Sequence, residues 1–491
     1  MITLDTQTVG GQAGPSGTGE RPRALKRDTL GVIGVLFFVF SAQAPLTGIA
    51  GASPIAVAIG NGTGVPAAYL TAGLIVLLFS VGYVAMSRHV VHAGAFYAYV
   101  GKGLGRTTGI GGAMVALLAY CAIQAAMYGL YGASVSALLE AYLGIAVPWW
   151  VCVLVTMAVI QVLGALGVEI GARVLAVLVL AEFSLLLAFA VVTFFRGGGP
   201  EGLAPLASFG PEAVLSGAPG VAVMFAVASM FGFEATAIYG EEARQPHRTI
   251  PRATYTAVIG ITAFFAFVTW MNVSAHGPSH AAAQAGAALE GGDGTAYVFG
   301  PIANLLGGWT TDVLQILLCT SLFAGMLAFH NSVTRYFFSL SRDGVLPAVL
   351  GRLNRHHSPA PAGALQTLIA LVLVAPFALG GQDPVLTLFS WFSGLAVLSM
   401  MLLYLLTSIS VFVFFRRERL DTRVWHTAVA PILGALGLAS AIALILANFT
   451  TLIDGDTTTA IRLVLPIPVL FAAGVVLARV RKDVLSPHTV A

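Results

Sequence analysis

The sequence is poor in charge and in cysteine. Only 9% of its 491 residues are charged and 57% are hydrophobic, with a mean hydropathy of +0.89. Soluble domains carry about 25% charged residues, so most of this chain is predicted to face lipid or other apolar helices. The net charge of +3 is too small and too scattered to indicate nucleic acid as a partner. The three cysteines, Cys121, Cys152 and Cys319, lie in or beside apolar runs without CxxC spacing, which favours packing roles over disulfides.

Catalytic signatures are also missing. The chain has no HExxH, no GxSxG and no nucleotide-binding loop, so neither a membrane-embedded enzyme nor an ATP-driven pump is indicated. His276 and His280 have the spacing of metal ligands on a helix, but Gly277 and Pro278 between them are expected to interrupt any helix. We therefore expect no catalytic residue, no metal and no cofactor.

The two ends of the chain are expected to be tails. The first twenty residues are rich in Gly, Ser and Thr, and no short apolar run with a cleavage site follows them. We predict a disordered cytoplasmic tail over residues 1–28 rather than a signal peptide, and a second cytoplasmic tail over residues 483–491.

Between the tails lie twelve apolar runs long enough to cross about 30 Å of hydrocarbon. They begin near Leu30, Pro66, Ile110, Val147, Ala172, Ala218, Ala253, Leu305, Ala362, Val385, Val429 and Ile461. With twelve spans, only Arg196 and Arg462 of the 24 Lys and Arg residues fall on one side of the membrane. The positive-inside rule then places both termini in the cytoplasm, with the protein in the plasma (inner) membrane.

Two of these runs are interrupted, and they open two halves of five spans each. Because five is odd, the second half would enter the membrane upside down relative to the first. Interrupted helices in corresponding positions of inverted halves indicate a central binding site near the bilayer midplane. We therefore predict an all-α membrane protein with a ten-helix inverted-repeat core over residues 29–415 and two additional spanning helices over 416–482.

The first interruption follows Pro45, which removes a backbone donor and disfavours helix at the preceding residue. The restarting half-helix would offer free amides to a substrate carboxylate. The residues expected to supply them are Thr47, Gly48, Ile49, Ala50 and Gly51. A proline kink with glycines for close packing is the alternative.

The second interruption is Met230-Phe231-Gly232-Phe233-Glu234, where a glycine among aromatic residues precedes a carboxylate. Unpaired carbonyls at the end of a half-helix suit an ammonium group, and Phe231 could close over the substrate. The expected contacts are Ala228, Ser229, Phe231 and Gly232. We predict that residues 46–51 and 229–233 are non-helical and face each other across a central cavity; ordinary packing is the alternative for the aromatic residues.

Several motifs together resemble those of the amino acid–polyamine–organocation (APC) superfamily of transporters. They are Phe231-Gly232-Phe233-Glu234, Glu241-Glu242-Ala243-Arg244 with Ile250-Pro251-Arg252-Ala253, His92-Ala93-Gly94-Ala95-Phe96-Tyr97, and Ser341-Arg342-Asp343-Gly344-Val345-Leu346-Pro347. The resemblance covers roughly residues 28–480. It implies a LeuT-like fold with broken helices 1 and 6 that moves amino acids or related amines by alternating access.

Two acidic residues are candidates for ion coupling. Glu182 lies in the middle of the fifth span, where some proton-coupled relatives place a lysine. Intramembrane acids are functional by default, so Glu182 could carry a proton, bind sodium or pair with a cationic substrate; a hydrogen-bonded structural role is the alternative. Paired hydroxyls at Thr320 and Ser321 would favour sodium. Glu234 is a second candidate proton carrier, or a structural acceptor for the free amides of the broken helix.

Specificity is expected to come from side chains around the breaks. Tyr120, Gln124 and Tyr128 are spaced by four residues and so share one helical face. Gln124 could contact the substrate, although hydrogen bonding between helices would explain the same stripe. Trp391, with Ser393, could form an outer gate. The sequence thus predicts proton-coupled uptake of amino acids or amines, with amino acid/amine exchange and sodium-coupled symport as alternatives.

Overall fold

The computed structural model describes residues 31–90, 95–168, 172–234, 236, 245–342 and 344–480. Within those ranges the chain is helical, and its only β-type pairing is an isolated bridge between Gly199 and Gly202. The predicted tails over residues 1–28 and 483–491 lie outside the described residues, as does the cluster formed by Glu241, Glu242 and Arg244.

The helices of the first part are α1 (Val32–Gln43), η1 (Thr47–Ala52), α2 (Ser53–Ile55), η2 (Ala56–Gly60), η3 (Gly62–Gly64), α3 (Val65–Ser87), α4 (Ala95–Leu104), α5 (Arg106–Leu143), α6 (Trp149–Ala165), α7 (Ala172–Phe195), α8 (Pro205–Phe209), α9 (Pro211–Leu215) and α10 (Pro219–Ala228). Those of the second part are α12 (Pro246–His276), α13 (Pro278–Glu290), α14 (Ala296–Leu306), α15 (Trp309–Arg342), η5 (Ala348–Gly351), α16 (Ala360–Leu379), η6 (Pro384–Phe389), α17 (Ser390–Glu418), η7 (Trp425–Val429), α18 (Ala430–Ala447), α19 (Phe449–Ile453), α20 (Thr457–Val464) and α21 (Pro466–Val480).

Nine helices in the described ranges are long and apolar enough to cross a membrane, and a tenth span is obtained if the bent pair Pro205–Leu215 and Pro219–Ala228 counts as one. A straight crossing needs about 20 apolar residues. The first, fourth and sixth expected spans fall short as single helices because α1, α6 and α10 have 12, 17 and 10 residues. The chain is therefore a multi-pass membrane protein, in which two of the short helices adjoin the predicted interruptions.

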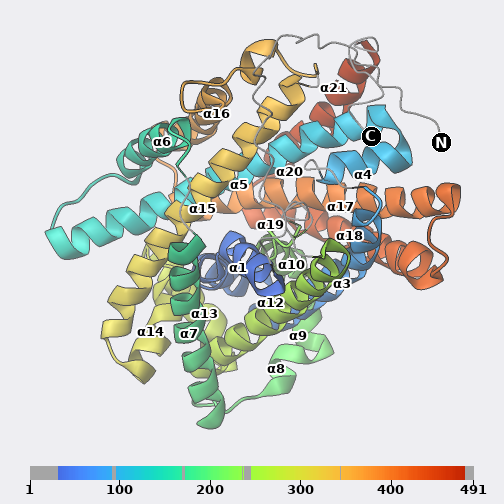
Figure 1. The fold of residues 1–491 in the computed structure, drawn as a ribbon. Helices are drawn as coiled ribbons and strands as arrows, with labels where there is room; N and C mark the ends of the chain where they lie inside the picture. Colours follow the sequence, from blue (N-terminus) through green and yellow to red (C-terminus); the bar gives the residue numbers. More distant parts are fainter. Residues whose placement is uncertain are drawn as a thin grey trace, which may run out of the picture.

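The interrupted segments lie in the middle of the bundle. Figure 1 shows α1 and α10 near its centre and α6, α8 and α16 at its edge. The long helix α5 packs against α15, α17 and α21, while α3 packs against α10, α12 and α18. Small residues permit these close approaches: a Cβ atom at Gly434 of α18 would meet the Phe79 backbone nitrogen of α3 at 3.0 Å.

The first break lies earlier than predicted. Ala44 adopts a left-handed conformation, with φ 42° and ψ 72°, and the helix restarts at once with Pro45 and Leu46. Thr47–Ala52 then forms a π-helix, so the prediction that residues 46–51 are non-helical was wrong. The physical reason is the clash of a proline ring with the residue before it, which disfavours helical backbone at that residue and not after the proline.

The second break lies where it was predicted. Helix α10 ends at Ala228, and Ser229 to Glu234 form successive turns. Gly232 has φ 107°, a conformation that glycine adopts at no steric cost. The prediction of non-helical backbone over residues 229–233 is therefore confirmed.

Candidate substrate site

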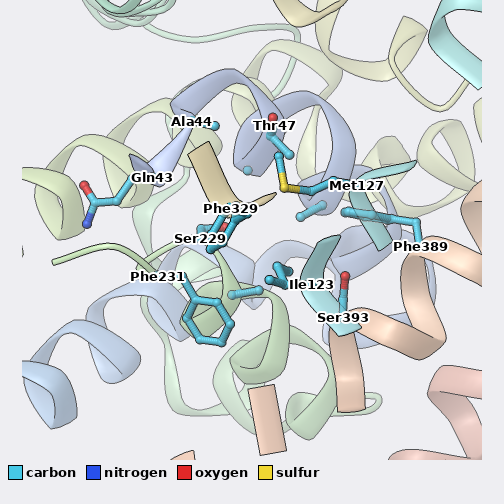
Figure 2. A pocket seen from close by; sticks show the side chains of 13 residues that line it. Gln43, Ala44, Thr47, Ile123, Met127, Ser229, Phe231, Phe329, Phe389 and Ser393 are labelled. Atoms are coloured by element: carbon cyan, nitrogen blue, oxygen red, sulfur yellow. The ribbon is translucent and has the colours of Figure 1, made fainter. Parts of the chain in front are cut away.

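A cavity of about 50 Å³ lies between the two breaks (Figure 2). Its lining comes from the first break, α5, the second break, α15 and the start of α17. The lining residues are Gln43, Ala44, Thr47, Gly48, Ala52, Ile123, Met127, Ala228, Ser229, Phe231, Phe329, Phe389 and Ser393. The prediction that the two breaks face each other across a central cavity is thus confirmed.

Hydrogen bonds connect the two breaks directly. The Gln43 side-chain amide donates to the Met230 carbonyl at 3.4 Å. The Tyr69 hydroxyl of α3 donates to the Gly48 carbonyl at 3.4 Å and lies 3.3 Å from the Ser229 hydroxyl. Its ring stacks on Phe265 of α12, with 5.0 Å between centroids. Tyr69 therefore contacts both breaks without lining the cavity itself.

Three polar atoms of lining residues are buried without a hydrogen-bond partner in the described part of the chain. They are Oε1 of Gln43, Oγ1 of Thr47 and Oγ of Ser393. Buried polar groups are almost always hydrogen-bonded, so unpartnered ones around a cavity are available to a ligand. The lining contains no charged side chain, which means that a bound zwitterion would rely on neutral dipoles.

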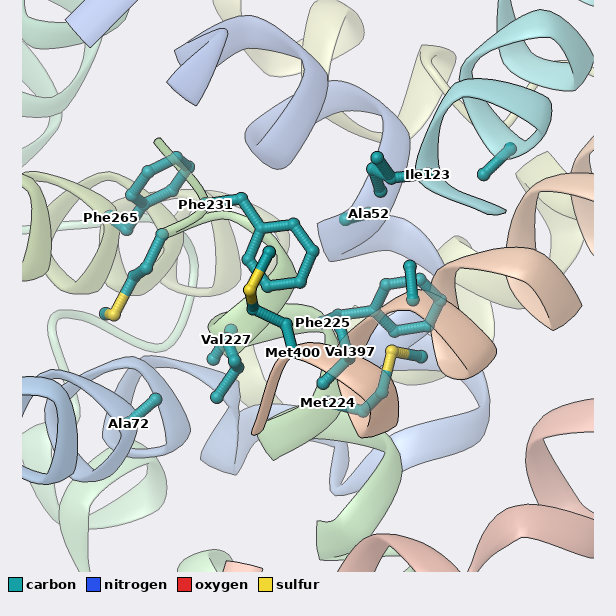
Figure 3. Close-up of a cluster of buried hydrophobic side chains, with 14 of the residues drawn as sticks. Ala52, Ala72, Ile123, Met224, Phe225, Val227, Phe231, Phe265, Val397 and Met400 are labelled. Atoms are coloured by element: carbon teal, nitrogen blue, oxygen red, sulfur yellow. The ribbon is translucent and has the colours of Figure 1, made fainter. Parts of the chain in front are cut away.

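The remaining wall of the cavity is apolar. Ile123 and Met127 of α5, Phe329 of α15, and Phe389 at the end of η6 contribute side chains to it. Phe231 lies against the buried cluster shown in Figure 3, which includes Phe225 and Met400. An apolar wall of this kind excludes water and favours an apolar ligand surface.

Five of the predicted substrate contacts line the cavity, namely Thr47, Gly48, Ala228, Ser229 and Phe231. Ile49, Ala50, Gly51, Gly232 and Trp391 do not. Gly51 faces α5, because a Cβ atom there would meet Leu130 at 2.5 Å. Trp391 packs edge-on against Phe377, with 5.6 Å between centroids.

Several amides near the first break already have acceptors. The Leu46 amide donates to a Glu182 carboxylate oxygen at 3.1 Å. The amides of Thr47 and Gly48 donate to the Ala44 carbonyl at 2.9 and 3.4 Å. The expected carboxylate site is therefore partly occupied by the protein itself. Gly48 instead permits close packing, since a Cβ atom there would lie 2.5 Å from the Phe265 ring and 2.8 Å from the Ser229 hydroxyl.

Gln124 faces a neighbouring helix and not the cavity. The Gln366 side-chain amide of α16 donates to its Oε1 at 2.6 Å, and its own amide donates to the Tyr128 hydroxyl at 3.4 Å. The cavity is reached instead by Ile123 and Met127, which occupy a different face of α5. For Gln124 the structure therefore matches the second interpretation, a hydrogen bond between helices, and not a contact with the substrate.

Glu182 is fully buried on α7, next to the first break. Its Oε2 accepts the Leu46 amide, and its Oε1 has no hydrogen-bond partner within 3.5 Å in the described part of the chain. Ser321 of α15 interacts with the same carboxyl group, whereas the Thr320 hydroxyl bonds back to its own helix at the Ile316 carbonyl. No described residue forms an ion pair with Glu182, so this carboxyl is held by neutral dipoles alone.

Glu234 belongs to the second break and is enclosed by aromatic residues. Its Oε2 accepts the Gly232 amide at 2.9 Å and the Tyr404 hydroxyl at 3.4 Å, and the Tyr83 hydroxyl donates to its backbone carbonyl at 3.0 Å. The Phe233 ring packs edge-on against Tyr404, with 5.6 Å between centroids. These contacts match the structural alternative for Glu234, an acceptor for a free amide.

Other lining residues were missed by the sequence interpretation. Gln43 and Ala44 precede the proline; the proline rule places the break at Ala44, but it does not predict that either residue lines a cavity. Ile123, Met127 and Phe329 have no local signal, because an apolar residue that lines a cavity has the same pattern as one that packs in a core.

The described fold and this site define a class: a polytopic membrane protein with a cavity between two interrupted helices. Comparison with known proteins narrows the class. The profile of the amino acid permease family matches residues 30–472, so the chain belongs to that family, in the APC superfamily. It is a transporter and not an enzyme, and its family supports amino acid transport.

Two named relatives are similar over different lengths. The branched-chain amino acid permease BcaP of Lactococcus lactis is 25% identical over 403 residues, covering 77% of this chain and 80% of the relative. The general amino acid permease AGP2 of Saccharomyces cerevisiae is 25% identical over 299 residues, covering 54% of this chain and 48% of the relative.

Proposed function

We propose that this protein is a proton-coupled secondary transporter that takes up amino acids with uncharged, apolar side chains. The observation that carries the proposal is the cavity between the breaks, whose lining combines an apolar wall with Gln43, Thr47 and Ser393, three residues with an unpartnered side-chain oxygen in the described part of the chain. The polar oxygens suit the amino and carboxylate groups shared by all amino acids, and the apolar wall suits an aliphatic side chain. The similarity to a branched-chain amino acid permease supports this choice.

The proposed topology has twelve spans, with both termini in the cytoplasm and the protein in the plasma (inner) membrane. The ten-helix core over residues 29–415 consists of two inverted halves, and residues 416–482 add two spans. The charge bias of the loops supports the orientation. The central position of both breaks supports the inverted repeat, since this arrangement places broken helices around the substrate.

Glu182 is proposed as the proton carrier. A buried carboxylate without a cationic partner is costly, and protonation would remove that cost. Protonation would also weaken the bond from the Leu46 amide, because hydrogen bonds to charged acceptors are stronger than those to neutral ones. Proton uptake would therefore loosen the first break at a point adjacent to the cavity.

Alternating access would then depend on the hydrogen bonds between the breaks. Gln43 and Tyr69 hold the first break against Met230 and Ser229. A substrate oxygen that accepts from the Gln43 side-chain amide or the Ser229 hydroxyl competes with Met230 or Tyr69 for that group, so binding and the relative position of the two breaks are coupled. We propose that this competition, together with protonation of Glu182, permits one half to move against the other.

The proposal is tested with purified protein in liposomes. We expect an inward proton gradient to drive accumulation of labelled leucine, with unlabelled isoleucine and valine competing and lysine and glutamate not competing. Sodium-driven accumulation without a response to pH would overturn proton coupling. Accumulation that requires an amino acid or amine preloaded inside would indicate an exchanger, and failure to transport any amino acid would overturn the function.

A further inference from the structure

Arginines gather where the end of α3 meets the end of α17 and the start of η7. The cationic and imidazole side chains of this group, called here the arginine cluster, are Arg88, His89, Arg416, Arg417, Arg419, Arg423 and His426. Helix η7 packs against both α3 and α17. The His89 ring also lies edge-on against Phe415 of α17, with 5.6 Å between centroids, so the three elements form one surface.

Arg88 is the least satisfied member of the cluster. Its Nε is buried and has no hydrogen-bond partner in the described residues. The Nδ1 of His426 is likewise buried without a partner there. The charges of Arg88 and Arg423 both act on the His426 ring and on the Tyr255 hydroxyl of α12. Cations and hydrogen-bond donors from three elements therefore converge at one place.

The acids within the described part of this surface neutralise only some of these cations. Asp421 pairs with Arg423 at 2.6 Å, and Glu418 lies 3.8 Å from Arg417 in an exposed pair. Arg88, Arg416 and Arg419 have no acidic partner within 4.0 Å in that part of the chain. Among the described residues of this surface the cations outnumber the acids, and such an excess of positive charge attracts an anion.

Large apolar side chains are exposed beside these cations. Leu420, Val424 and Trp425 are 56%, 62% and 50% exposed. Exposing these apolar side chains to water is unfavourable, whereas exposing them at a membrane–water interface is not. Tryptophan is enriched at such interfaces, and basic residues are enriched in the loops beside them. The arginine cluster therefore lies at the level where lipid head groups would meet it.

We propose that Arg88, His426 and the Nη1 group of Arg423, to which the Asp421 carboxylate does not bond, bind the phosphate of an anionic phospholipid, with its acyl chains beside Val424 and Trp425. Basic pockets between spanning helices are known sites for anionic head groups. The proposal does not depend on the transported substrate. It requires only that this end of the bundle lies at a membrane surface.

The test uses the full-length protein in an uncharged detergent. Added phosphatidylglycerol should raise the melting temperature by several degrees more than an equal amount of phosphatidylcholine, because a ligand of the folded state stabilises it. The difference should fall by at least half in Arg88→Gln and in Arg423→Gln, and persist in the control Arg352→Gln, an exposed arginine outside the cluster. Sodium phosphate should give no comparable rise, since it lacks acyl chains.

A second measurement does not depend on whether the arginine variants fold. Brominated phosphatidylglycerol should quench the tryptophan fluorescence of the wild type more than brominated phosphatidylcholine does, and Trp425→Phe should remove that difference. Equal effects of the two lipids, or an equal loss in Arg352→Gln, would overturn the proposal in favour of general attraction to charge. Stabilisation by sodium phosphate alone would overturn the lipid as the ligand.

Discussion

The two breaks differ in where the backbone amides that they free find a hydrogen-bond acceptor. Each interrupts a helix inside the membrane and leaves amides that need acceptors. At the second break the acceptor is local: the Gly232 amide bonds to Glu234, two residues further along the chain. At the first break the acceptor of the Leu46 amide is Glu182, which belongs to another helix 136 residues away.

This difference distinguishes a carboxyl that bonds within its own break from one that connects two elements. Glu234 moves with its own break and is enclosed by Tyr83 and Tyr404. Glu182 connects α7 to the first break, so any change in its charge alters a contact between two elements. From this comparison we expect loss of the Glu182 carboxyl to affect transport and loss of the Glu234 carboxyl to affect stability.

The largest effect is expected at the point where the breaks touch. Gly48→Ala should abolish transport of every substrate, because its Cβ atom would lie 2.5 Å from the Phe265 ring, and overpacking of this kind costs about 1–3 kcal/mol. Uptake into liposomes measures this. The matched control is Gly260→Ala in α12, where the nearest atom to the new Cβ would be 3.8 Å away. Normal uptake by the Gly48 variant would show that the breaks need not approach so closely.

The two carboxyls should respond differently to the same substitution. Glu182→Gln keeps a hydrogen-bond acceptor but cannot carry a proton, so it should lose accumulation driven by a pH gradient and retain substrate exchange. Glu234→Gln should keep pH-driven accumulation and melt at a lower temperature. Uptake and exchange assays on both variants, beside thermal unfolding, test this. The opposite assignment would follow if only Glu234→Gln lost pH-driven accumulation.

Backbone substitutions at the two breaks should have effects of opposite sign. Gly232→Ala places a side chain at φ 107° and should destabilise the fold by about 1–3 kcal/mol. Ala44→Gly relieves a left-handed alanine with φ 42° and should stabilise it by about 1 kcal/mol. Thermal unfolding in detergent measures both. A loss of stability in Ala44→Gly would mean that the first break is not strained.

The smallest effect is expected for the hydroxyl that contacts both breaks. Tyr69→Phe removes hydrogen bonds of 3.3 and 3.4 Å and should cost about 1 kcal/mol, with a KM that rises by the same factor for all substrates. The control is Tyr297→Phe, because the Tyr297 hydroxyl is buried without a hydrogen-bond partner in the described residues. If KM rose for only some substrates, Tyr69 would be a specificity residue and not a positioning one.

Local chemistry made the breaks predictable from sequence, while the site depends on packing. Pro45 disfavours helical backbone at the residue before it, and Gly232 permits a positive φ, so the interruptions could be placed within a few residues. The face of α5 that lines the cavity could not be inferred, because the rotation of that helix is coupled to Gln366 on a helix more than 200 residues away. The sequence placed Glu182 first and Glu234 second as candidate proton carriers, but the contacts that distinguish the two carboxyls depend on the fold.

The composition of the cavity wall has a consequence for the evolution of this protein. The polar oxygens come from Gln43, Thr47 and Ser393, whereas most of the apolar wall comes from Ile123, Met127 and Phe329 on α5 and α15. If the polar oxygens recognise the amino acid core as proposed, a mutation in the wall reshapes the space for a side chain and leaves that recognition intact. Under that proposal, descendants of this chain would acquire new substrates after gene duplication through single changes in the wall, without passing through an inactive intermediate.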